Sequence, residues 1–206
     1  LESSEPSVQY KVRVGVLGEA NVSPAVKALQ RRIKNSPRVE QLFANRGRDG
    51  RIEPVDNVYK KWIGAHWVLA TLADIGYPSG DASLFPAVDQ VLNCWLHPVS
   101  IRECVCEGTP PAHRRSGVAI VNGRARRCAS QQGNALFSAV VLGFLDDRVH
   151  QLAECLIRWQ WPDGGWNCDK DPEAAHSSFW ESLIPLRGLA HYVRLTGDTR
   201  ARESVA

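Results

Sequence analysis

The stretch RVHQLAECLIRWQ, residues 148–160, gives the clearest structural signal in the chain. Five apolar side chains recur there at the spacing i, i+3, i+4, i+7, i+8, which is typical of a helix with one apolar face. They are Val149, Leu152, Ala153, Leu156 and Ile157. The same spacing recurs in LFPAVDQVLNCWL, residues 84–96, at a displacement of 61 residues. The chain is therefore expected to repeat a helical unit.

A different kind of segment comes before each amphipathic stretch. Residues 65–75 and 134–145 are apolar on nearly every face, which is typical of helices buried on all sides. A third buried helix is expected from 178, and a weaker amphipathic helix over 24–34. The pattern predicts an all-α fold with inner and outer helix layers, in about four helical hairpins that stack side by side.

Two segments interrupt this pattern. Residues 100–127 are rich in Arg, Pro and Gly and are expected to form an inserted loop within a single domain over 1–206. The stretch VQYKVRVGVLG, residues 8–18, alternates like a strand. Helix is favoured there, because a lone strand in a helical chain would have no partner.

Composition narrows the possible classes of protein. Hydrophobic residues make up 44% of the chain and charged residues 23%, a globular balance that excludes a disordered tail. The net charge of +3 argues against nucleic acid as the partner. No apolar run approaches the roughly 20 residues of a membrane-spanning helix. Residues 1–10 lack the pattern of a signal peptide, which favours a cytoplasmic protein with reduced cysteines.

The stretch QWPDGGW, residues 160–166, resembles the Gln-Trp repeat motif of squalene-hopene cyclases. Residues 162–190 also resemble the β subunit of protein prenyltransferases, in which a Gly-Gly-aromatic turn precedes a helix opening with Ser-Phe-Trp, here Ser178-Phe179-Trp180. The chain looks most similar to small bacterial proteins of this group. The resemblance implies a partial α/α toroid that acts on an isoprenoid-like ligand.

The chain departs from both families at their chemical motifs. The cyclases use an acidic D-x-D-D motif, and the nearest match, Asp146-Asp147, is expected in a turn between helices. The prenyltransferases bind zinc through Asp, Cys and His. In the corresponding run the Asp is replaced by Ala174 and the Cys by His176, which is still a competent zinc ligand.

The starts of the inner helices are expected to meet on one rim, which gathers the candidate functional residues. The metal candidates are Cys128, Cys168, Asp169 and His176, a possible tetrahedral zinc set. The catalytic candidates are Asp169, His176 and Glu181. The ligand-binding candidates are Trp62, His66, Gln131, Trp166, Trp180 and Arg127. Free N–H groups at helix starts suit an anion such as a diphosphate.

Each of these residues also has a structural interpretation. Cys128 fits a small buried residue, His176 an ordinary loop residue, and Glu181 a capping box with Ser178. Arginines near this rim, with His113-Arg114-Arg115 among them, suit a phosphate or a solvated face. Two functions stay open. One is an enzyme, or a decayed enzyme, acting on a small apolar or diphosphate-bearing ligand. The other is a non-catalytic helical-repeat module for a protein, peptide or lipid partner, or for a second copy.

Overall fold

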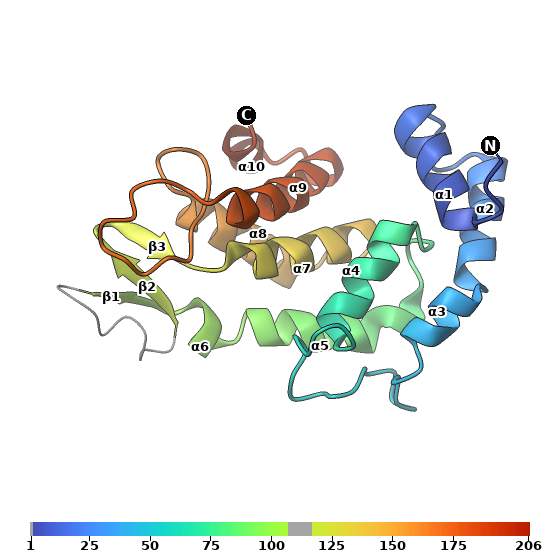
Figure 1. Ribbon diagram of the computed structural model, residues 1–206, viewed down its shortest axis with the longest axis horizontal. Coiled ribbons are helices and arrows are strands. Elements are labelled where there is room, and N and C mark those ends of the chain that lie inside the picture. The colour runs from blue at the N-terminus through green and yellow to red at the C-terminus, as the bar shows by residue number, and fades with distance from the viewer. Residues whose placement is uncertain (1, 107–116) are drawn as a thin grey trace. The chain divides into compact units, whose positions relative to one another are not determined.

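The computed structural model describes residues 2–106 and 117–206 of the chain (Figure 1). His113, Arg114 and Arg115 lie outside the described residues. In chain order the elements are α1 (Pro6–Lys11), the π-helical turn η1 (Val12–Val16), α2 (Pro24–Lys34), α3 (Pro37–Leu42), α4 (Ala65–Ile75), the 3-10 turn η2 (Ala82–Leu84), α5 (Phe85–Trp95), α6 (Pro98–Ile101), β1 (Glu103–Val105), β2 (Val118–Val121), β3 (Arg124–Arg126), α7 (Ala129–Val141), α8 (Asp147–Trp159), α9 (Phe179–Thr196) and α10 (Thr199–Ser204).

The internal contacts divide the chain into two compact units. Unit 1 consists of Leu1–Gln90 with Val141–Phe144, and unit 2 of Val91–Val140 with Leu145–Ala206. Each unit is described by itself below. The expectation of a single domain over 1–206 stays a prediction.

In unit 1, helix α2 forms where the periodicity predicts it. Ser23 caps the helix, since its Oγ accepts a hydrogen bond from the Val26 amide at 3.2 Å. Val26, Leu29 and Ile33 lie on the buried face, each no more than 5% exposed. Helix α4 covers Ala65–Ile75, as predicted, and most of its side chains are buried.

The segment that alternates like a strand is helical, as expected. Helix α1 continues directly into η1. Tyr10 packs beside Gly76 at the end of α4, so closely that a Cβ on Gly76 would collide with the tyrosine ring. Gly76 also has a φ of +84°, which favours glycine. Helix α1 therefore packs against α2 and α4 rather than pairing with a strand, although no residue of 8–18 is fully buried.

In unit 2, helix α8 shows the predicted apolar stripe most clearly. Val149, Leu152 and Leu156 are fully buried on one face. Asp146 caps this helix, with its Oδ1 accepting hydrogen bonds from the amides of Arg148 at 3.0 Å and Val149 at 3.3 Å. The prediction that Asp146-Asp147 belongs to a turn between helices is confirmed for Asp146, the N-cap of α8, and is wrong for Asp147, which is the first residue of that helix.

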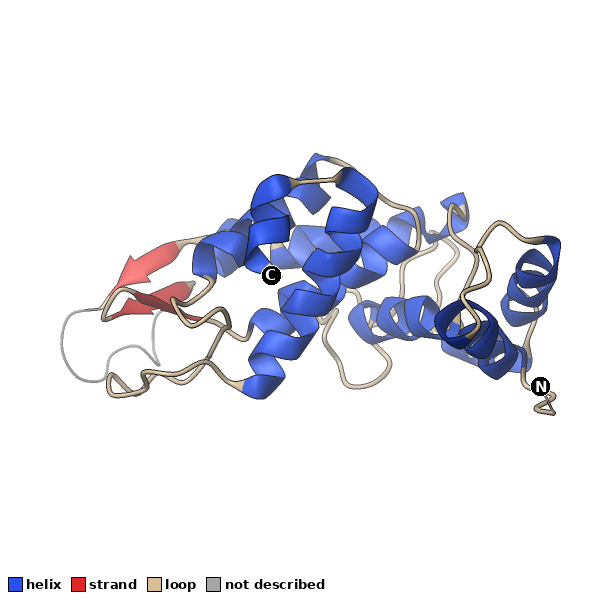
Figure 2. Cartoon of the chain, turned by 90° about the horizontal axis from the view of Figure 1, so that it is seen from above, coloured by secondary structure: helices blue, strands red, loops and turns tan. Residues whose placement is uncertain are grey.

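The all-α fold class is wrong. Helices make up 55% of the structure, but a three-stranded mixed sheet lies within the predicted 100–127 loop (Figure 2). Strand β1 pairs in parallel with β2, and β2 pairs antiparallel with β3. Asn122, with a φ of +49°, and Gly123, with a φ of +72°, form the tight turn between β2 and β3. The expected toroid of helical hairpins does not account for this sheet.

The physical reason for the sheet is local. Val118, Ala119 and Val121 are at most 5% exposed, so β2 is an apolar strand and most of its residues are buried. An Asn-Gly pair between two extended segments is a strong hairpin signal, because both residues tolerate positive φ.

Among the described helices, none combines the length and the apolar character needed to cross a bilayer.

Candidate metal centre

Three segments that are far apart in the sequence meet at the beginnings of α7 and α9. Arg126 forms a parallel β-bridge with Asn167, and the Arg127 amide donates a hydrogen bond to the Asn167 carbonyl at 3.1 Å. This pairing brings Cys128, the residue before α7, close to Cys168 in the loop after α8. The third segment is the first turn of α9, which carries Glu181.

Two glycines allow α7 and α9 to approach backbone to backbone. A Cβ on Gly188 would lie 2.6 Å from the Gly133 carbonyl oxygen, and a Cβ on Gly133 would lie 2.6 Å from the Pro185 backbone. No larger side chain fits at either position without moving a helix. The close approach lets the Ser130 amide, in the first turn of α7, donate to Glu181 Oε2 at 2.9 Å.

The loop that carries Cys168 is held at several points. The turn at Asp163-Gly164 closes through a hydrogen bond from the Trp161 amide to the Gly165 carbonyl at 2.8 Å. Trp166 is fully buried and its indole Nε1 donates to the Leu156 carbonyl at 2.9 Å. Asp163 Oδ2 accepts from the Ser177 amide at 2.7 Å. These contacts fix the ends of the loop on both sides of Cys168.

The centre itself consists of Cys128, Cys168 and Glu181. Their ligating atoms all lie within 4.8 Å of one another, and each residue is half-buried. The Cys168 thiol also donates to Glu181 Oε1 at 3.7 Å. Within residues 2–106 and 117–206, this is the one such group of three or more His, Cys, Asp or Glu side chains. The three side chains have the spacing to hold a metal ion.

The surroundings of the two thiols shift their pKa values in opposite directions. The hydrogen bond with the Cys168 thiol lowers the pKa of Cys128 to about 7, although burial and the Glu181 carboxylate act against this. The charges of Arg127 and Lys170 add to the lowering. The same hydrogen bond, together with burial and the charge of Glu181, raises the pKa of Cys168. One thiolate is therefore accessible at neutral pH, which is the form that binds metals.

The centre contains two of the four predicted metal ligands, Cys128 and Cys168. Asp169 and His176 do not belong to it. Asp169 is exposed and its Oδ1 accepts from the Asp171 amide at 2.9 Å. His176 is exposed too, and its carbonyl accepts from Asn167 Nδ2 at 2.9 Å.

Glu181 was expected as a catalytic residue or as part of a capping box, not as a ligand. Ser178 is the N-cap of α9, but its side chain makes no capping hydrogen bond. Glu181 instead accepts hydrogen bonds from the Ser130 amide on α7 and from the Cys168 thiol in the loop after α8. No local motif signals this contact, because it depends on how closely α7 and α9 approach each other.

The predicted ligand-binding residues of unit 2 have different environments. Trp166 is part of the core. Trp180, which precedes Glu181 in the sequence, is 74% exposed. Gln131 is half-buried, and its backbone N–H donates a hydrogen bond to the Cys128 carbonyl at 3.0 Å. Arg127 donates from Nε to Gln132 Oε1 at 3.2 Å. Of these four, Gln131 and Arg127 therefore border the metal centre.

Trp62 and His66, the other two predicted ligand-binding residues, belong to unit 1. Trp62 is 66% exposed, and its ring lies 4.4 Å from that of Trp67. His66 is only 2% exposed and lies against the rings of Tyr59 and Trp67, each at 5.1 Å. Burial lowers the pKa of His66 to about 4, so its imidazole is neutral at pH 7.

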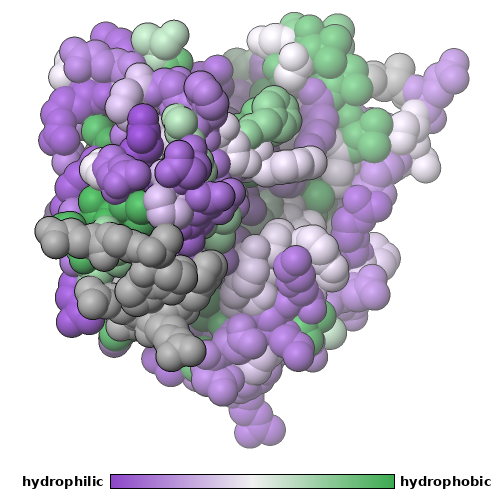
Figure 3. Space-filling model, turned by 60° about the vertical axis from the view of Figure 1, so that its left-hand side comes forward, coloured by the Kyte–Doolittle hydropathy of each residue, from purple (hydrophilic) through white to green (hydrophobic). Residues whose placement is uncertain are grey.

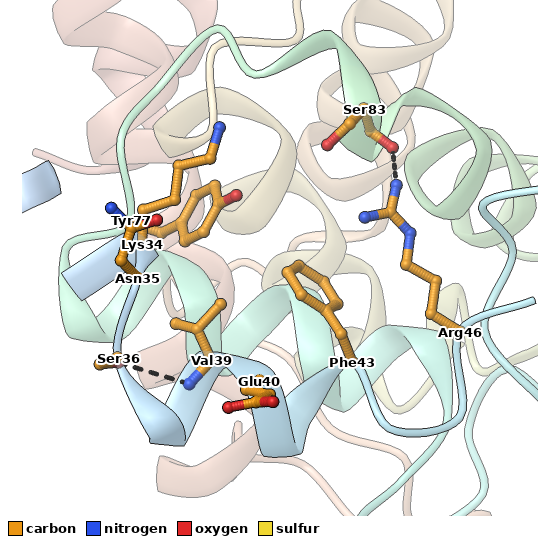
Figure 4. A pocket seen from close by; sticks show the side chains of 9 residues that line it. All are labelled: Lys34, Asn35, Ser36, Val39, Glu40, Phe43, Arg46, Tyr77 and Ser83. Atoms are coloured by element: carbon orange, nitrogen blue, oxygen red, sulfur yellow. Dashed lines mark hydrogen bonds between the residues drawn. The ribbon is translucent and has the colours of Figure 1, made fainter. Parts of the chain in front are cut away.

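Unit 1 also contains a cavity of about 400 Å³ (Figure 4). It is lined by Lys34, Asn35, Ser36, Val39, Glu40, Phe43, Arg46, Tyr77 and Ser83. Arg46 donates to the carbonyl of Ser83 and, at 3.3 Å, to that of Gly50. Lys34 Nζ lies 2.7 Å from Asp81 Oδ2. The two cations of this cavity thus have partners inside the fold.

Comparison with known proteins adds no relative. No family model, no curated protein and no solved structure matches this chain.

Proposed function

We propose that unit 2 binds a zinc ion through Cys128, Cys168 and Glu181. One observation carries this proposal, the convergence of two sulfurs and a carboxylate oxygen within 4.8 Å. In a tetrahedral zinc site with bonds of about 2.3 Å, neighbouring sulfurs are about 3.8 Å apart. A contraction of at most about 1 Å in the distances between these atoms therefore converts the observed group into a ligand set.

The donor atoms favour zinc over the hard cations. Magnesium and calcium take oxygen ligands, whereas two thiolates select a softer ion. Zinc accepts mixed sulfur and carboxylate ligands at the distances expected here. Metal binding also supplies the positive charge that would offset the negative charge of Glu181 and the thiolates.

Three protein ligands leave one position of a tetrahedral ion open. Open zinc sites are typical of catalytic centres, where the ion polarises a bound ligand or water. Phe179 and Trp180, the two residues before Glu181, are 73% and 74% exposed. Hydrophilic residues cover much of the face shown in Figure 3, with smaller apolar patches among them. An apolar ligand with an anionic head, such as an isoprenoid diphosphate, has complementary chemistry to an aromatic pair beside a cation.

The decisive experiment measures zinc affinity by competition with a chromophoric chelator. We expect one zinc per chain, and at least about 100-fold weaker binding in Cys128→Ser, Cys168→Ser and Glu181→Gln. Cys94→Ser is the matched control, because Cys94 is also a half-buried thiol of unit 2 but lies outside the centre. Equal zinc affinity in all four variants would exclude the centre.

The second candidate function is a non-catalytic binding module. It is favoured by the exposed Phe179 and Trp180, with the 46% exposed Leu183 one turn further along α9. The two functions differ in their dependence on zinc. Titration with farnesyl diphosphate, followed by tryptophan fluorescence, should show binding that a chelator abolishes if the zinc centre takes the anionic head. Binding that persists with the chelator, and is lost in Trp180→Ser, would instead favour the module.

A further inference from the structure

The two sulfurs of the metal centre are also placed for a second kind of chemistry. Cys128 Sγ and Cys168 Sγ lie within 4.8 Å of each other, and both residues are half-buried. A disulfide bond is about 2.05 Å long, so the sulfurs need to approach by less than about 3 Å. Side-chain rotation covers a distance of that order. Partial exposure also lets a small oxidant reach them.

The backbone around the pair suits a disulfide as well. The bridge between Arg126 and Asn167 and the hydrogen bond from the Arg127 amide to the Asn167 carbonyl put the two segments side by side. Paired segments run about 4.8 Å apart, and disulfides span Cα atoms that are about 4.4–6.8 Å apart. Cys128 and Cys168 follow this pairing by two residues and one residue. Large backbone movement is therefore unnecessary.

We propose that Cys128 and Cys168 form a reversible disulfide when a hydroperoxide reaches the metal-free centre, and that this modification prevents metal binding. The disulfide itself rests only on the positions of the two sulfurs, whereas its effect on metal rests on the proposed function. Oxidation removes two of the three ligands at once and leaves Glu181 alone.

Cys128 is the sulfur that attacks the peroxide. It immediately precedes the 13-residue helix α7, and Arg127 adjoins it in sequence. Positive charge at a helix start and on a neighbouring arginine stabilises negative sulfur during the attack.

The reaction balances without any further reagent. The Cys128 thiolate attacks one peroxide oxygen, the O–O bond breaks, and Cys128 becomes a sulfenic acid while an alcohol or water leaves. Cys168 then attacks the Cys128 sulfur, the S–S bond forms, and the sulfenic oxygen leaves as water. The two cysteines lose two electrons and the peroxide gains them. A cellular thiol reverses the change by exchange.

The test uses the full chain, reduced and stripped of metal, with equimolar hydrogen peroxide. Trypsin places the relevant cysteines in separate peptides: Cys128 in 128–148, Cys155 in 149–158 and Cys168 in 159–170. We expect a cross-linked pair of 128–148 with 159–170 that dithiothreitol releases. Zinc affinity should fall at least about 100-fold in the oxidised protein and return on reduction.

Two variants resolve the order of events. Cys168→Ser cannot close the disulfide, so dimedone should label the sulfenic acid at Cys128. Cys94→Ser should give the same cross-link as the unaltered chain. Zinc added before peroxide should slow the reaction, because the metal occupies the sulfur electron pairs.

The outcomes separate this inference from the proposed function. If the reduced chain binds zinc but peroxide yields no link between Cys128 and Cys168, the disulfide proposal is overturned and the zinc centre stands. If the link forms but the reduced chain does not bind zinc, the zinc centre is overturned and the disulfide stands without a role in metal binding. Dimedone labelling at Cys168 and not at Cys128 would overturn the assigned order of attack.

Discussion

Each unit contains a cluster of polar side chains around one carboxylate, Asp81 in unit 1 and Glu181 in unit 2. The two carboxylates have different partners. In unit 1, Asp81 Oδ2 meets Lys34 Nζ and the Tyr77 hydroxyl, both at 2.7 Å, and Asp81 Oδ1 accepts from the Ser83 amide at 3.0 Å. In unit 2, Glu181 meets an amide and two thiols. The first set is built around an ion pair, whereas the second brings three potential metal-ligand atoms within 4.8 Å of one another, with the charges of Arg127 and Lys170 acting on Cys128.

The pKa values follow the same division. Burial acts against ionisation of Asp81, but the hydrogen bonds from Lys34, Tyr77 and Ser83 prevail and hold its pKa well below the usual range. In the metal centre the pKa of Cys168 is raised by the hydrogen bond with Cys128, by burial and by the charge of Glu181. Metal binding to this set would release the thiol protons, because cysteine binds metals as the thiolate. The opposite pKa shifts of Asp81 and Cys168 therefore distinguish a structural ion-pair cluster from a candidate metal-binding site.

The largest expected effect is stabilisation by zinc. At a free zinc concentration of about 1,000 times Kd, binding to the folded state alone adds about 4 kcal/mol to the free energy of unfolding. Circular dichroism should show a clear rise in Tm with zinc for the unaltered chain. Glu181→Gln should show a much smaller rise. An equal rise in both proteins would mean that zinc acts elsewhere.

The second-largest effect is a loss of stability at low pH, which we expect from the buried His66 of unit 1. The pKa of the buried His66 is about 4 in the folded chain and about 6.5 when unfolded, so the unfolded state takes up the proton more readily. Its contribution to stability is complete above pH ~6.5 and falls as pH decreases, approaching a loss of about 3 kcal/mol near pH 4.

Urea unfolding at pH 7 and pH 4.5 measures this loss. His66→Gln carries no titrating ring, so the unaltered chain should lose more stability than this variant between the two values. Parallel losses in both proteins would contradict the assignment to His66.

The helices were largely predictable from sequence, and the sheet was not. Residues 65–75 and 148–160 carry strong apolar signals because whole turns of helix are buried there. The strands contain only three or four residues, too few for a period to appear. Asn122-Gly123 was the available signal, but it lay in a segment interpreted as a loop.

The metal centre was half predictable for a related reason. The starts of helices bring Cys128 and Cys168 together, which a helical repeat suggests. Glu181 has a plausible local role next to Ser178, and only the glycine contact between α7 and α9 shows that it faces Ser130 instead. Local sequence patterns thus identify the two cysteines of the centre, whereas the position of the Glu181 carboxylate depends on the tertiary packing of α7 against α9.

A third and smaller effect tests the self-contained cluster of unit 1. Asp81→Asn removes a charge whose side chain is 12% exposed, opposite a lysine that is 46% exposed. Solvent screens such a pair, so we expect a loss of about 1 kcal/mol at pH 7. Because the folded pKa of Asp81 is lowered, this contribution is present above pH ~3.9 and lost as pH falls through the folded value.

A double-mutant cycle with Lys34→Met isolates the ion pair from other effects of Asp81→Asn. The coupling between the two sites should account for part of the loss at pH 7. If the coupling is zero, the Tyr77 and Ser83 contacts alone stabilise this cluster.

The smallest effect is expected at His176, the residue that sequence reasoning placed in the metal site. The resemblance to zinc-binding enzymes gave it the role of a ligand, but its side chain is exposed and stands outside the group of Cys128, Cys168 and Glu181. His176→Ala should therefore change the free energy of unfolding by less than about 0.5 kcal/mol. Zinc affinity should stay within a factor of about three, because an exposed imidazole outside the ligand set contributes no bond. Both quantities are measured on one variant, by urea unfolding and by chelator competition. A large loss of zinc affinity at unchanged stability would show that the 167–178 loop rearranges to bring His176 to the open fourth position. In that case the centre, rather than being a three-ligand site, would be a closed four-ligand site, and the case for a catalytic zinc would weaken.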